Sequence, residues 1–278
     1  MVSIIVPVYN ESESIVTVLN DILELKGNFE VIVVDDYSTD GSRSILESMK
    51  GIKLISHLKN KGYSNSLKTG IKAAKGEWII IIDSDETYPV KAIPELLKYI
   101  DKYDMVIGAR MGSNVNIPIL RKPAKWFLSK LGNYIASQKI PDLNSGLRVF
   151  RKSLALKFWK LLPERFSFTI TMTLAALTNG YDVKYIPIDY YKRKGKSTIH
   201  PINDFVGFIK LLFKMSLFFK PLKIFIPFSI FIFLMGIIIA IVGLLIFDKL
   251  LDVTFVMITL SAVQIFIFGL IAEIIVRK

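Results

Sequence analysis

The sequence predicts an α/β protein with a doubly wound, mostly parallel sheet, followed by amphipathic interface helices and a two-helix transmembrane hairpin. Short β-branched runs alternate with helix-like stretches over roughly the first hundred residues. Two long apolar stretches near the C-terminus are long enough to cross a bilayer. The chain is also 52% hydrophobic, with a mean hydropathy of +0.45, which is high for a purely soluble protein.

Five short runs rich in Val and Ile are typical of strands that a sheet buries on both faces. These runs are residues 3–9, 30–36, 52–56, 77–83 and 104–109. The helix-like stretches between them are residues 13–25, 41–50, 64–74 and 91–100. Strand alternating with helix indicates parallel strands joined by right-handed crossovers, and such sheets bind ligands at the carboxyl ends of their strands.

Polar residues gather where the predicted strands end. They are Asn10 and Glu11 after the first strand, Asp35 and Asp36 after the second, and Asp83 and Asp85 after the fourth. No glycine occurs in "VPVYNESES", so the glycine-rich turn that seats a dinucleotide pyrophosphate is absent. A bound diphosphate would therefore need another source of positive charge.

Asp83 and Asp85 are candidates to bind a cation that supplies this positive charge. At spacing i, i+2 on an extended segment both carboxylates point to one side, where they can share a divalent cation with phosphate oxygens and water. The alternative is that one carboxylate caps the next helix while the other lies in a solvated turn. Their position at the end of a buried strand favours the metal site.

The net charge of +12 is unevenly distributed. Residues 1–109 contain 12 basic and 16 acidic side chains, whereas residues 110–223 contain 21 basic and 5 acidic ones. A basic segment beside a membrane anchor predicts contact with anionic headgroups or with a phosphorylated substrate. Nucleic acid is disfavoured as a partner, because no nucleic-acid motif is present.

The predicted membrane spans are residues 224–247 and 253–276, joined by the short link "DKLLD". Basic residues flank the outer ends of the pair, and the link has a single lysine; the flanking residues are Lys220, Lys223, Arg277 and Lys278. Since basic residues stay on the cytoplasmic side, the N-terminal region and the C-terminus are both expected there. The first ten residues do not resemble a signal peptide, and the absence of cysteine excludes disulfides and thiolate metal sites.

Several motifs together resemble one enzyme family. The segments are "IIVPVYNE", "VVDDYSTDGS", "NKGYSNSLKTGIKAAKGEWIIIIDSDETYP", "PDLNSGLRVFRK" and "NGYDVKYIPIDYYKRKGKST". In this order and spacing they resemble inverting family 2 glycosyltransferases of the GT-A fold. The match covers residues 2–220. Within that family, the chain more specifically resembles the membrane-associated polyprenyl-phosphate glycosyltransferases, which include the dolichyl-phosphate mannose synthases. One branch of that group also has a two-helix tail.

The resemblance implies transfer of a hexosyl residue from UDP-glucose, GDP-mannose or UDP-N-acetylglucosamine to dolichyl or undecaprenyl phosphate, with Mg²⁺ or Mn²⁺ as cofactor. The processive-synthase motif Q-x-x-R-W is absent, which favours one sugar per acceptor. The nucleotide-binding residues implied by the resemblance are Pro7, Tyr9, Glu11, Asp35, Asp36 and Asp83. The implied metal ligands are Asp83 and Asp85. Thr87 is a third candidate, where mannose synthases often have a better ligand, glutamine.

Asp142, Asp85 and Arg193 are the implied catalytic residues. A phosphate acceptor is already anionic at neutral pH, so we expect Asp142 to orient the acceptor or the sugar, with general base as the second choice. The segment "RKGKS", which contains Arg193, resembles the one that closes over the donor phosphates. The implied acceptor and phosphate contacts are Arg121, Ser145, Arg148, Lys196 and Ser197.

Two stretches combine aromatic and basic residues, residues 120–137 and 204–220. Helices of this composition can lie in the headgroup plane, although the first could instead pack on the domain core. The expected organisation is a cytoplasmic catalytic domain at 1–200, an interface helix at 201–221 and a hairpin at 222–278.

Other functions are less favoured. A family 2 transferase with a non-lipid acceptor would not require basic aromatic helices beside a hairpin. A membrane-tethered nucleotide-binding regulator would not require the acceptor-side motif "PDLNSGLRVFRK". The hairpin could also associate with copies of itself. No motif in the sequence distinguishes the sugar, the base or the polyprenol.

Overall fold

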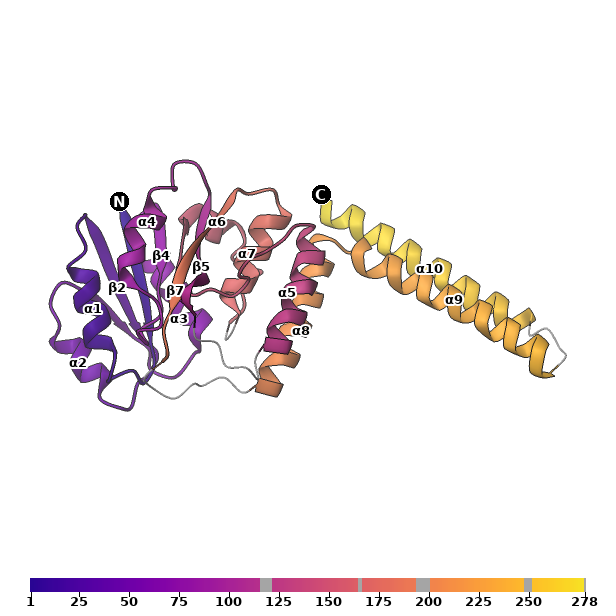
Figure 1. Ribbon diagram of the computed structural model, residues 1–278, viewed down its shortest axis with the longest axis horizontal. Helices are drawn as coiled ribbons and strands as arrows, with labels where there is room; N and C mark the ends of the chain where they lie inside the picture. The colour runs from indigo at the N-terminus through magenta and orange to yellow at the C-terminus, as the bar shows by residue number, and fades with distance from the viewer. Residues whose placement is uncertain (116–121, 165–166, 194–200, 248–251, 278) are drawn as a thin grey trace. The chain divides into compact units, whose positions relative to one another are not determined.

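The computed structural model describes residues 1–115, 122–164, 167–193, 201–247 and 252–277. Its strands are β1 Val2–Val8, β2 Phe29–Asp35, β3 Lys53–Ser56, β4 Trp78–Ile81, β5 Met105–Val115, β6 Arg148–Arg151 and β7 Val183–Tyr190. Its helices are α1 Ile15–Leu23, α2 Ser42–Ser48, α3 Tyr63–Ala73, η1 Val90–Ala92, α4 Ile93–Leu97, α5 Lys122–Ala136, α6 Lys152–Lys157, α7 Phe168–Thr178, α8 Pro201–Phe219, α9 Leu222–Phe247 and α10 Asp252–Arg277 (Figure 1). By its internal contacts the chain divides into residues 1–209 and residues 210–278.

The seven strands form one sheet in the order β3-β2-β1-β4-β6-β5-β7. β1 lies between β2 and β4 and is parallel to both, with Val8 opposite Asp35 and Ile5 opposite Ile81. β6 alone is antiparallel to its neighbours β4 and β5 among the described strands. The predicted doubly wound, mostly parallel sheet is confirmed, and three of its strands end at the same edge.

Strands that are apolar on both sides explain why the sheet is covered on both faces. On β1, Ile4 and Val6 belong to a core formed with α1, α2 and α4. Ile5 points to the opposite face, where Gly70 brings the backbone of α3 against it. Four consecutive isoleucines, at the end of β4 and directly after it, are all 0% exposed; they are residues 79–82. This run therefore packs on both faces of the sheet.

The sequence patterns did not predict β6, β7 or α7. β6 is only four residues long and begins and ends with arginine, so it lacks a strand's apolar run. α7, with the sequence FTITMTLAALT, is buried almost all round and contains β-branched residues that also suit a strand. Its helical state follows from tertiary packing, including the contact between Phe168 and Phe150 on β6, whose ring centroids lie 6.3 Å apart.

The amphipathic stretch in the middle of the chain forms α5, which has one packed face and one exposed face. Ile135 is 1% exposed, and Gly132 lies close to Leu143. By contrast, Trp126 is 64% exposed and Tyr134 48% exposed. The helix therefore packs on its own domain and presents aromatic rings to solvent, and its placement in the headgroup plane stays a prediction.

The C-terminal unit contains the predicted hairpin. α9 and α10 pack against each other along their lengths (Figure 1), and their apolar spans Leu222–Ile246 and Asp252–Val276 have mean hydropathies of 3.0 and 2.4. Each span has 25 residues, or about 37 Å of helix, which exceeds the ~30 Å hydrocarbon thickness. A Cβ on Gly269 would lie 2.4 Å from Cβ of Phe225, so this glycine permits close packing of the two helices.

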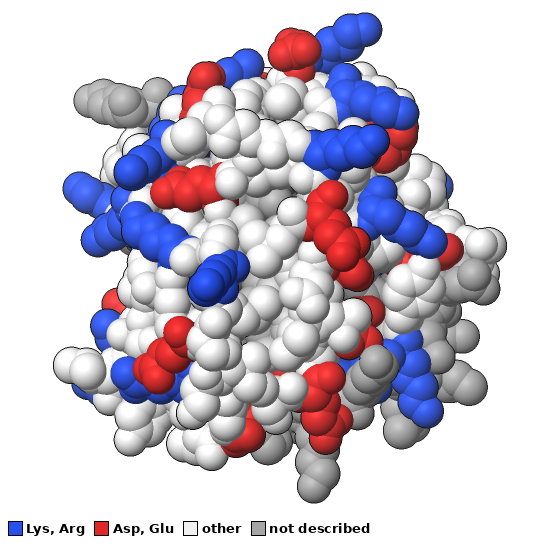
Figure 2. Space-filling model, turned by 90° about the vertical axis from the view of Figure 1, so that its left-hand side faces the viewer, with Lys and Arg blue, Asp and Glu red and all other residues white. Residues whose placement is uncertain are grey.

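Figure 2 shows the side of the molecule that lies at the left of Figure 1, where α1 and α2 lie. Basic and acidic side chains are interspersed over this face rather than gathered by sign. This distribution agrees with the near balance of charges in residues 1–109. The face therefore offers no basic stripe of the kind that binds a nucleic-acid backbone.

Gly70→Ala tests the packing of α3 on the sheet. The new Cβ would lie 2.4 Å from Cγ2 of Ile5, so we expect a loss of about 1–3 kcal/mol in the free energy of unfolding. Gly207→Ala is the matched control, because that helical glycine has open space around it and alanine favours helix. Urea unfolding of the full chain in detergent measures both. Equal stability of the two variants would show that α3 does not pack as described.

Candidate active site

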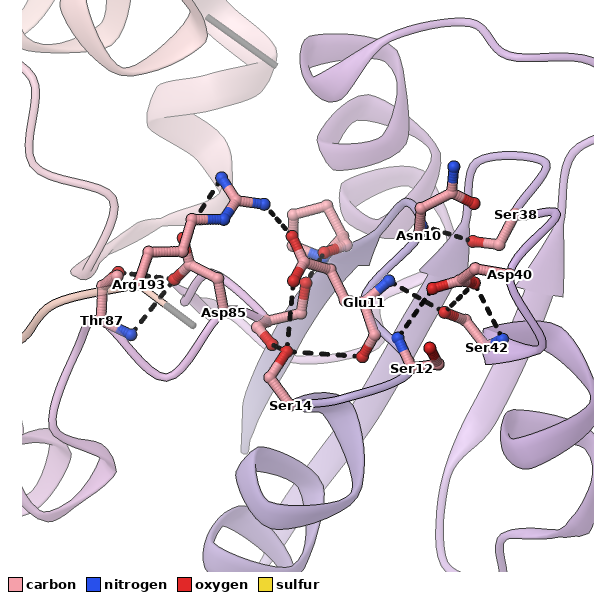
Figure 3. Close-up of polar contacts among 12 residues, drawn as sticks. Asn10, Glu11, Ser12, Ser14, Ser38, Asp40, Ser42, Asp85, Thr87 and Arg193 are labelled. Carbon is pink, nitrogen blue, oxygen red and sulfur yellow. Dashed lines mark hydrogen bonds and ion pairs between the residues drawn. The ribbon is translucent and has the colours of Figure 1, made fainter. Parts of the chain in front are cut away.

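The candidate site lies at the carboxyl edge of β1, β2 and β4. Asp85 follows β4 and its side chain is buried. The Thr87 hydroxyl donates a hydrogen bond to Oδ1 of Asp85 at 2.5 Å, and the Thr87 backbone N–H donates to the same oxygen at 3.2 Å (Figure 3). Thr87 therefore orients the Asp85 carboxylate and leaves Oδ2 facing the rest of the site.

Asp83 lies on the same loop and is half-buried. The Tyr63 hydroxyl, at the start of α3, donates to Oδ1 of Asp83 at 2.7 Å. On the other side, a Cβ on Gly146 would lie 2.4 Å from Oδ2 of Asp83, so only glycine fits there. Burial, together with the nearby Asp85 carboxylate, raises the pKa of Asp83 to about 6.

These two carboxylates suit a divalent cation. Among the described residues, no group of three or more His, Asp or Glu side chains could hold a metal by itself. Mg²⁺ is commonly bound by one or two carboxylates together with substrate phosphates and water, which is what two aspartates at this edge could provide. A cation there would also offset the electrostatic cost of placing the two carboxylates side by side.

Arg193 approaches this loop from the end of β7. The Tyr191 N–H donates to the Thr87 carbonyl at 2.9 Å, which brings the following residues to the site. The Arg193 guanidinium then pairs with Oε1 of Glu11, and its Nη1 lies 3.6 Å from Oδ2 of Asp85 (Figure 3). Glu11 is 8% exposed, and burial raises its pKa, although Arg193 opposes that shift.

Hydrogen bonds between loops hold the β1 end of the site. The Ser84 hydroxyl donates to the Pro7 carbonyl at 2.9 Å, which joins the loop carrying Asp83 and Asp85 to β1. The Ser12 N–H donates to Asp40 at 2.9 Å, which joins the loop after β1 to the loop after β2 (Figure 3). Tyr9 follows β1 and is 37% exposed, so its ring is accessible beside the site.

Asp35 and its neighbour Asp36 have different surroundings. Oδ1 of Asp35 accepts the Ser38 N–H at 3.1 Å, but its buried Oδ2 has no hydrogen-bond partner among the described residues. Such an oxygen favours a ligand that donates a hydrogen bond. Asp36 instead accepts the backbone N–H groups of Lys61 and Gly62 at 2.8 and 2.7 Å, so it joins two loops.

Asp142 forms a buried ion pair that the sequence did not predict. Nε and Nη2 of Arg110 each donate to the Asp142 carboxylate at 2.7 Å. Asp142 is 1% exposed, and the Arg110 guanidinium also lies 5.2 Å from the centre of the Tyr190 ring. The available signal was a single arginine directly after the apolar run "DMVIGA", but residue type alone does not show its partner.

Two of the predicted acceptor contacts are buried in the structure. Arg148 is 0% exposed, and its guanidinium donates to the carbonyl oxygens of Ser145 and Thr169 and to the Thr173 hydroxyl. Ser145 is also 0% exposed, and its hydroxyl donates to the Gly108 carbonyl. Both side chains therefore brace the loop that carries Asp142, and their contact with an acceptor phosphate stays a prediction. The other predicted contacts, Arg121, Lys196 and Ser197, lie outside the described residues.

Known proteins resemble the chain in sequence and fold. Residues 3–159 match the family described as Glycosyl transferase family 2, and residues 220–277 match the GtrB C-terminal hairpin. A dolichyl-phosphate hexose transferase of Haloferax volcanii is 26% identical over 219 residues, which cover 77% of this chain and 93% of that protein. A bactoprenol glucosyl transferase of Shigella phage SfV is 32% identical over 173 residues, which cover 59% of this chain and 56% of that protein.

A solved structure shares the fold. It is glucosyl-3-phosphoglycerate synthase of Mycobacterium tuberculosis in complex with Mn²⁺, UDP and glucosyl-3-phosphoglycerate. The TM-score is 0.61 at 17% identity, and the match covers 77% of this chain and 79% of the other. At this identity the likeness establishes the fold alone, which agrees with the GT-A fold expected from the sequence.

Arg110→Met tests the buried ion pair. Removing the guanidinium leaves the Asp142 charge buried without its main partner, so we expect a loss of about 3–5 kcal/mol in the free energy of unfolding. Replacing both residues, as Arg110→Met with Asp142→Leu, should be less harmful than the single change. Arg43→Met is the control, since its pair with Glu47 is exposed and should contribute less than about 1 kcal/mol. Urea unfolding with similar losses for Arg110→Met and Arg43→Met would contradict this role.

Proposed function

The chain belongs to glycosyl transferase family 2, and on that premise we propose that it transfers one hexosyl residue, with inversion, from a nucleoside-diphosphate sugar to polyprenyl phosphate. The candidate donors are UDP-glucose, GDP-mannose and UDP-N-acetylglucosamine, and the acceptor is dolichyl or undecaprenyl phosphate. One observation carries the proposal: a single chain joins paired carboxylates at the sheet's carboxyl edge to an apolar hairpin that matches the GtrB hairpin family. The relatives named above, which act on lipid-linked phosphates, support it.

Asp83 and Asp85 would hold Mg²⁺ or Mn²⁺, and the bound cation would stabilise the charge that develops on the leaving diphosphate. Thr87 contributes by orienting Asp85, since its hydroxyl proton is directed at that carboxylate. Arg193 lies close enough to Asp85 to contact the same phosphates after a small movement. The free oxygen of Asp35 is suited to accept a hydrogen bond from the nucleoside, whereas Asp36 supports the pocket through the loops it joins.

Asp142 is better suited to orientation than to proton removal. Its carboxylate already accepts two hydrogen bonds from the Arg110 guanidinium, which hold both of its oxygens in place. A phosphate acceptor is largely ionised at neutral pH, with a second pKa of about 6, so it can attack without a strong base. The pair would instead place one carboxylate and one guanidinium at fixed positions beside the sugar and the acceptor phosphate.

The membrane-facing parts fit a lipid acceptor. On α5, Trp126 and Tyr134 are exposed, and the Lys130 ammonium lies 5.9 Å from the centre of the Trp126 ring. On α8, Phe213 and Phe218 are 51% and 44% exposed. Such rings suit the interfacial region of a bilayer, with lysines reaching toward headgroups. In this proposal the hairpin spans the membrane twice, with the catalytic domain and the C-terminus in the cytoplasm.

The direct test is an assay of the purified full chain with labelled UDP- and GDP-sugars, with and without a polyprenyl phosphate. We expect label in the lipid phase for one donor, only with Mg²⁺ or Mn²⁺, and at least about a hundredfold less with Asp85→Asn or after chelation. Label on a soluble acceptor alone would support the non-lipid alternative. No transfer with any donor and acceptor would overturn the proposal.

Thr87→Val tests whether Thr87 acts through Asp85. Valine keeps the shape but loses the hydroxyl that orients the carboxylate, so we expect about tenfold weaker apparent Mn²⁺ affinity. Thr87→Ser should behave like the wild type. Thr17→Val, an exposed threonine on α1, is the matched control. A Mn²⁺ titration of activity compares the four proteins, and an unchanged Thr87→Val titration would show that Thr87 has no such role.

A further inference from the structure

A pocket of about 350 Å³ lies on the outer side of α3, outside the site described above. Its lining comes from two parts of the catalytic domain: α3 with Lys61, two residues before it, and the segment between α6 and α7. The lining residues are Lys61, Asn65, Lys68, Thr69, Lys72, Trp159 and Glu164. The five residues from α3 and its start are spaced so that they share one face of the helix.

Two lysines lie against one indole, and a third, Lys61, lines the same pocket. The Lys68 and Lys72 ammonium groups lie 5.7 and 5.3 Å from the centre of the Trp159 ring, within the range of cation–π attraction. Among the described residues, no carboxylate oxygen lies within 4.0 Å of the ammonium group of Lys61, Lys68 or Lys72. With Glu164 included, the lining has a net charge of +2.

The positive charges in this pocket are incompletely compensated. Burial lowers the pKa of Lys68, and the nearby Lys72 adds to that shift while Glu164 opposes it. Lys68 also donates to the Leu162 carbonyl at 2.5 Å, which holds its ammonium in place. Two like charges held beside one ring gain stability when an anion lies between them.

The polar groups of the pocket are also fixed in place. The Thr69 hydroxyl lies 2.9 Å from Nε2 of His57, whose Nδ1 lies 2.6 Å from Asp36. The Asn65 side-chain amide donates to the Lys61 carbonyl at 3.0 Å. A lining whose side chains are already ordered loses less conformational entropy when a ligand binds.

From this arrangement we infer that the pocket binds a phosphate-bearing anion, either a soluble phosphate compound or a lipid headgroup. A phosphomonoester has a charge of about −1.5 to −2 at neutral pH, which matches the net charge of the lining, whereas a single carboxylate would leave it positive. Lysine ammonium groups bind phosphate as point charges without demanding one geometry. The site is distinct from the donor site, which uses carboxylates and a cation.

Lysine footprinting of the full chain tests the site without requiring a variant to fold. The protein in neutral detergent is treated with an acetylating reagent across a titration of inorganic phosphate, with sodium chloride adjusted to constant ionic strength. Mass spectrometry then measures modification of each lysine. We expect phosphate to protect Lys61, Lys68 and Lys72, and to leave the exposed Lys50 and Lys91 unchanged.

A second arm distinguishes the two sources of phosphate. The chain is placed in lipid nanodiscs that contain either zwitterionic lipid alone or added anionic phospholipid. Protection by dissolved phosphate assigns the site to soluble compounds, whereas protection by anionic lipid alone assigns it to headgroups. No protection in either arm, or equal protection of Lys50, would overturn the inference.

Charge removal provides the matched comparison. In the double variant Lys61→Gln with Lys72→Gln, we expect about tenfold more phosphate for half-protection of Lys68, because two charge-assisted contacts are lost. Lys50→Gln removes the same kind of charge from another surface and should leave the titration unchanged. A double variant that titrates like the wild type would show that these lysines do not form the site.

Discussion

The parallel, in-register pairing of β1 with β2 and β4 is the constraint on which the rest of the structure depends. Because these strands are apolar on both faces, the apolar pattern alone does not specify their register. The polar residues at their ends supply the missing information. A slip that drew Asp83 between neighbouring strands would bury a carboxylate without a partner, which costs several kcal/mol. The same residues that limit the sheet therefore line its binding edge.

The two arginine–carboxylate contacts at this edge differ in their surroundings. Asp142, the partner of Arg110, is 1% exposed and accepts three hydrogen bonds from that residue, so the pair belongs to the fixed frame. The side chain of Arg193 is 27% exposed and contacts two carboxylates from different loops. A guanidinium in that position can exchange one acidic partner for a phosphate oxygen. Glycosyl transfer from a diphosphate donor to a phosphate acceptor would use fixed charges to orient the reactants and a movable charge to bind the donor phosphates.

Much of this arrangement could be predicted from the sequence, because the signals were local. The run of isoleucines before Asp83 predicted both the strand and the position of its end, and the spacing of Asp83 and Asp85 predicted a shared direction. Pairing across the sheet could not be predicted in this way. The antiparallel β6 between β4 and β5 depends on contacts between residues about seventy and about forty positions apart.

The features that the sequence did not predict have a common physical origin. Arg148 and Ser145 were assigned to the acceptor through the family resemblance, and the structure shows both buried and bonded to backbone carbonyls. Arg110 was missed because an isolated arginine after a strand does not show that its partner lies 32 residues away. Residue type predicts what chemistry a side chain can do. Only the fold shows whether that side chain faces the ligand or the interior.

The proposed chemistry depends most on a divalent cation that Asp83 and Asp85 would hold at this edge together with the donor diphosphate. Anomalous diffraction from crystals of the full chain grown with Mn²⁺ and a nucleoside diphosphate tests that claim directly. We predict one strong manganese peak within about 2.5 Å of a carboxylate oxygen of Asp85, with the diphosphate beside it. A peak elsewhere, or a diphosphate bound without a cation between it and these aspartates, would contradict the account.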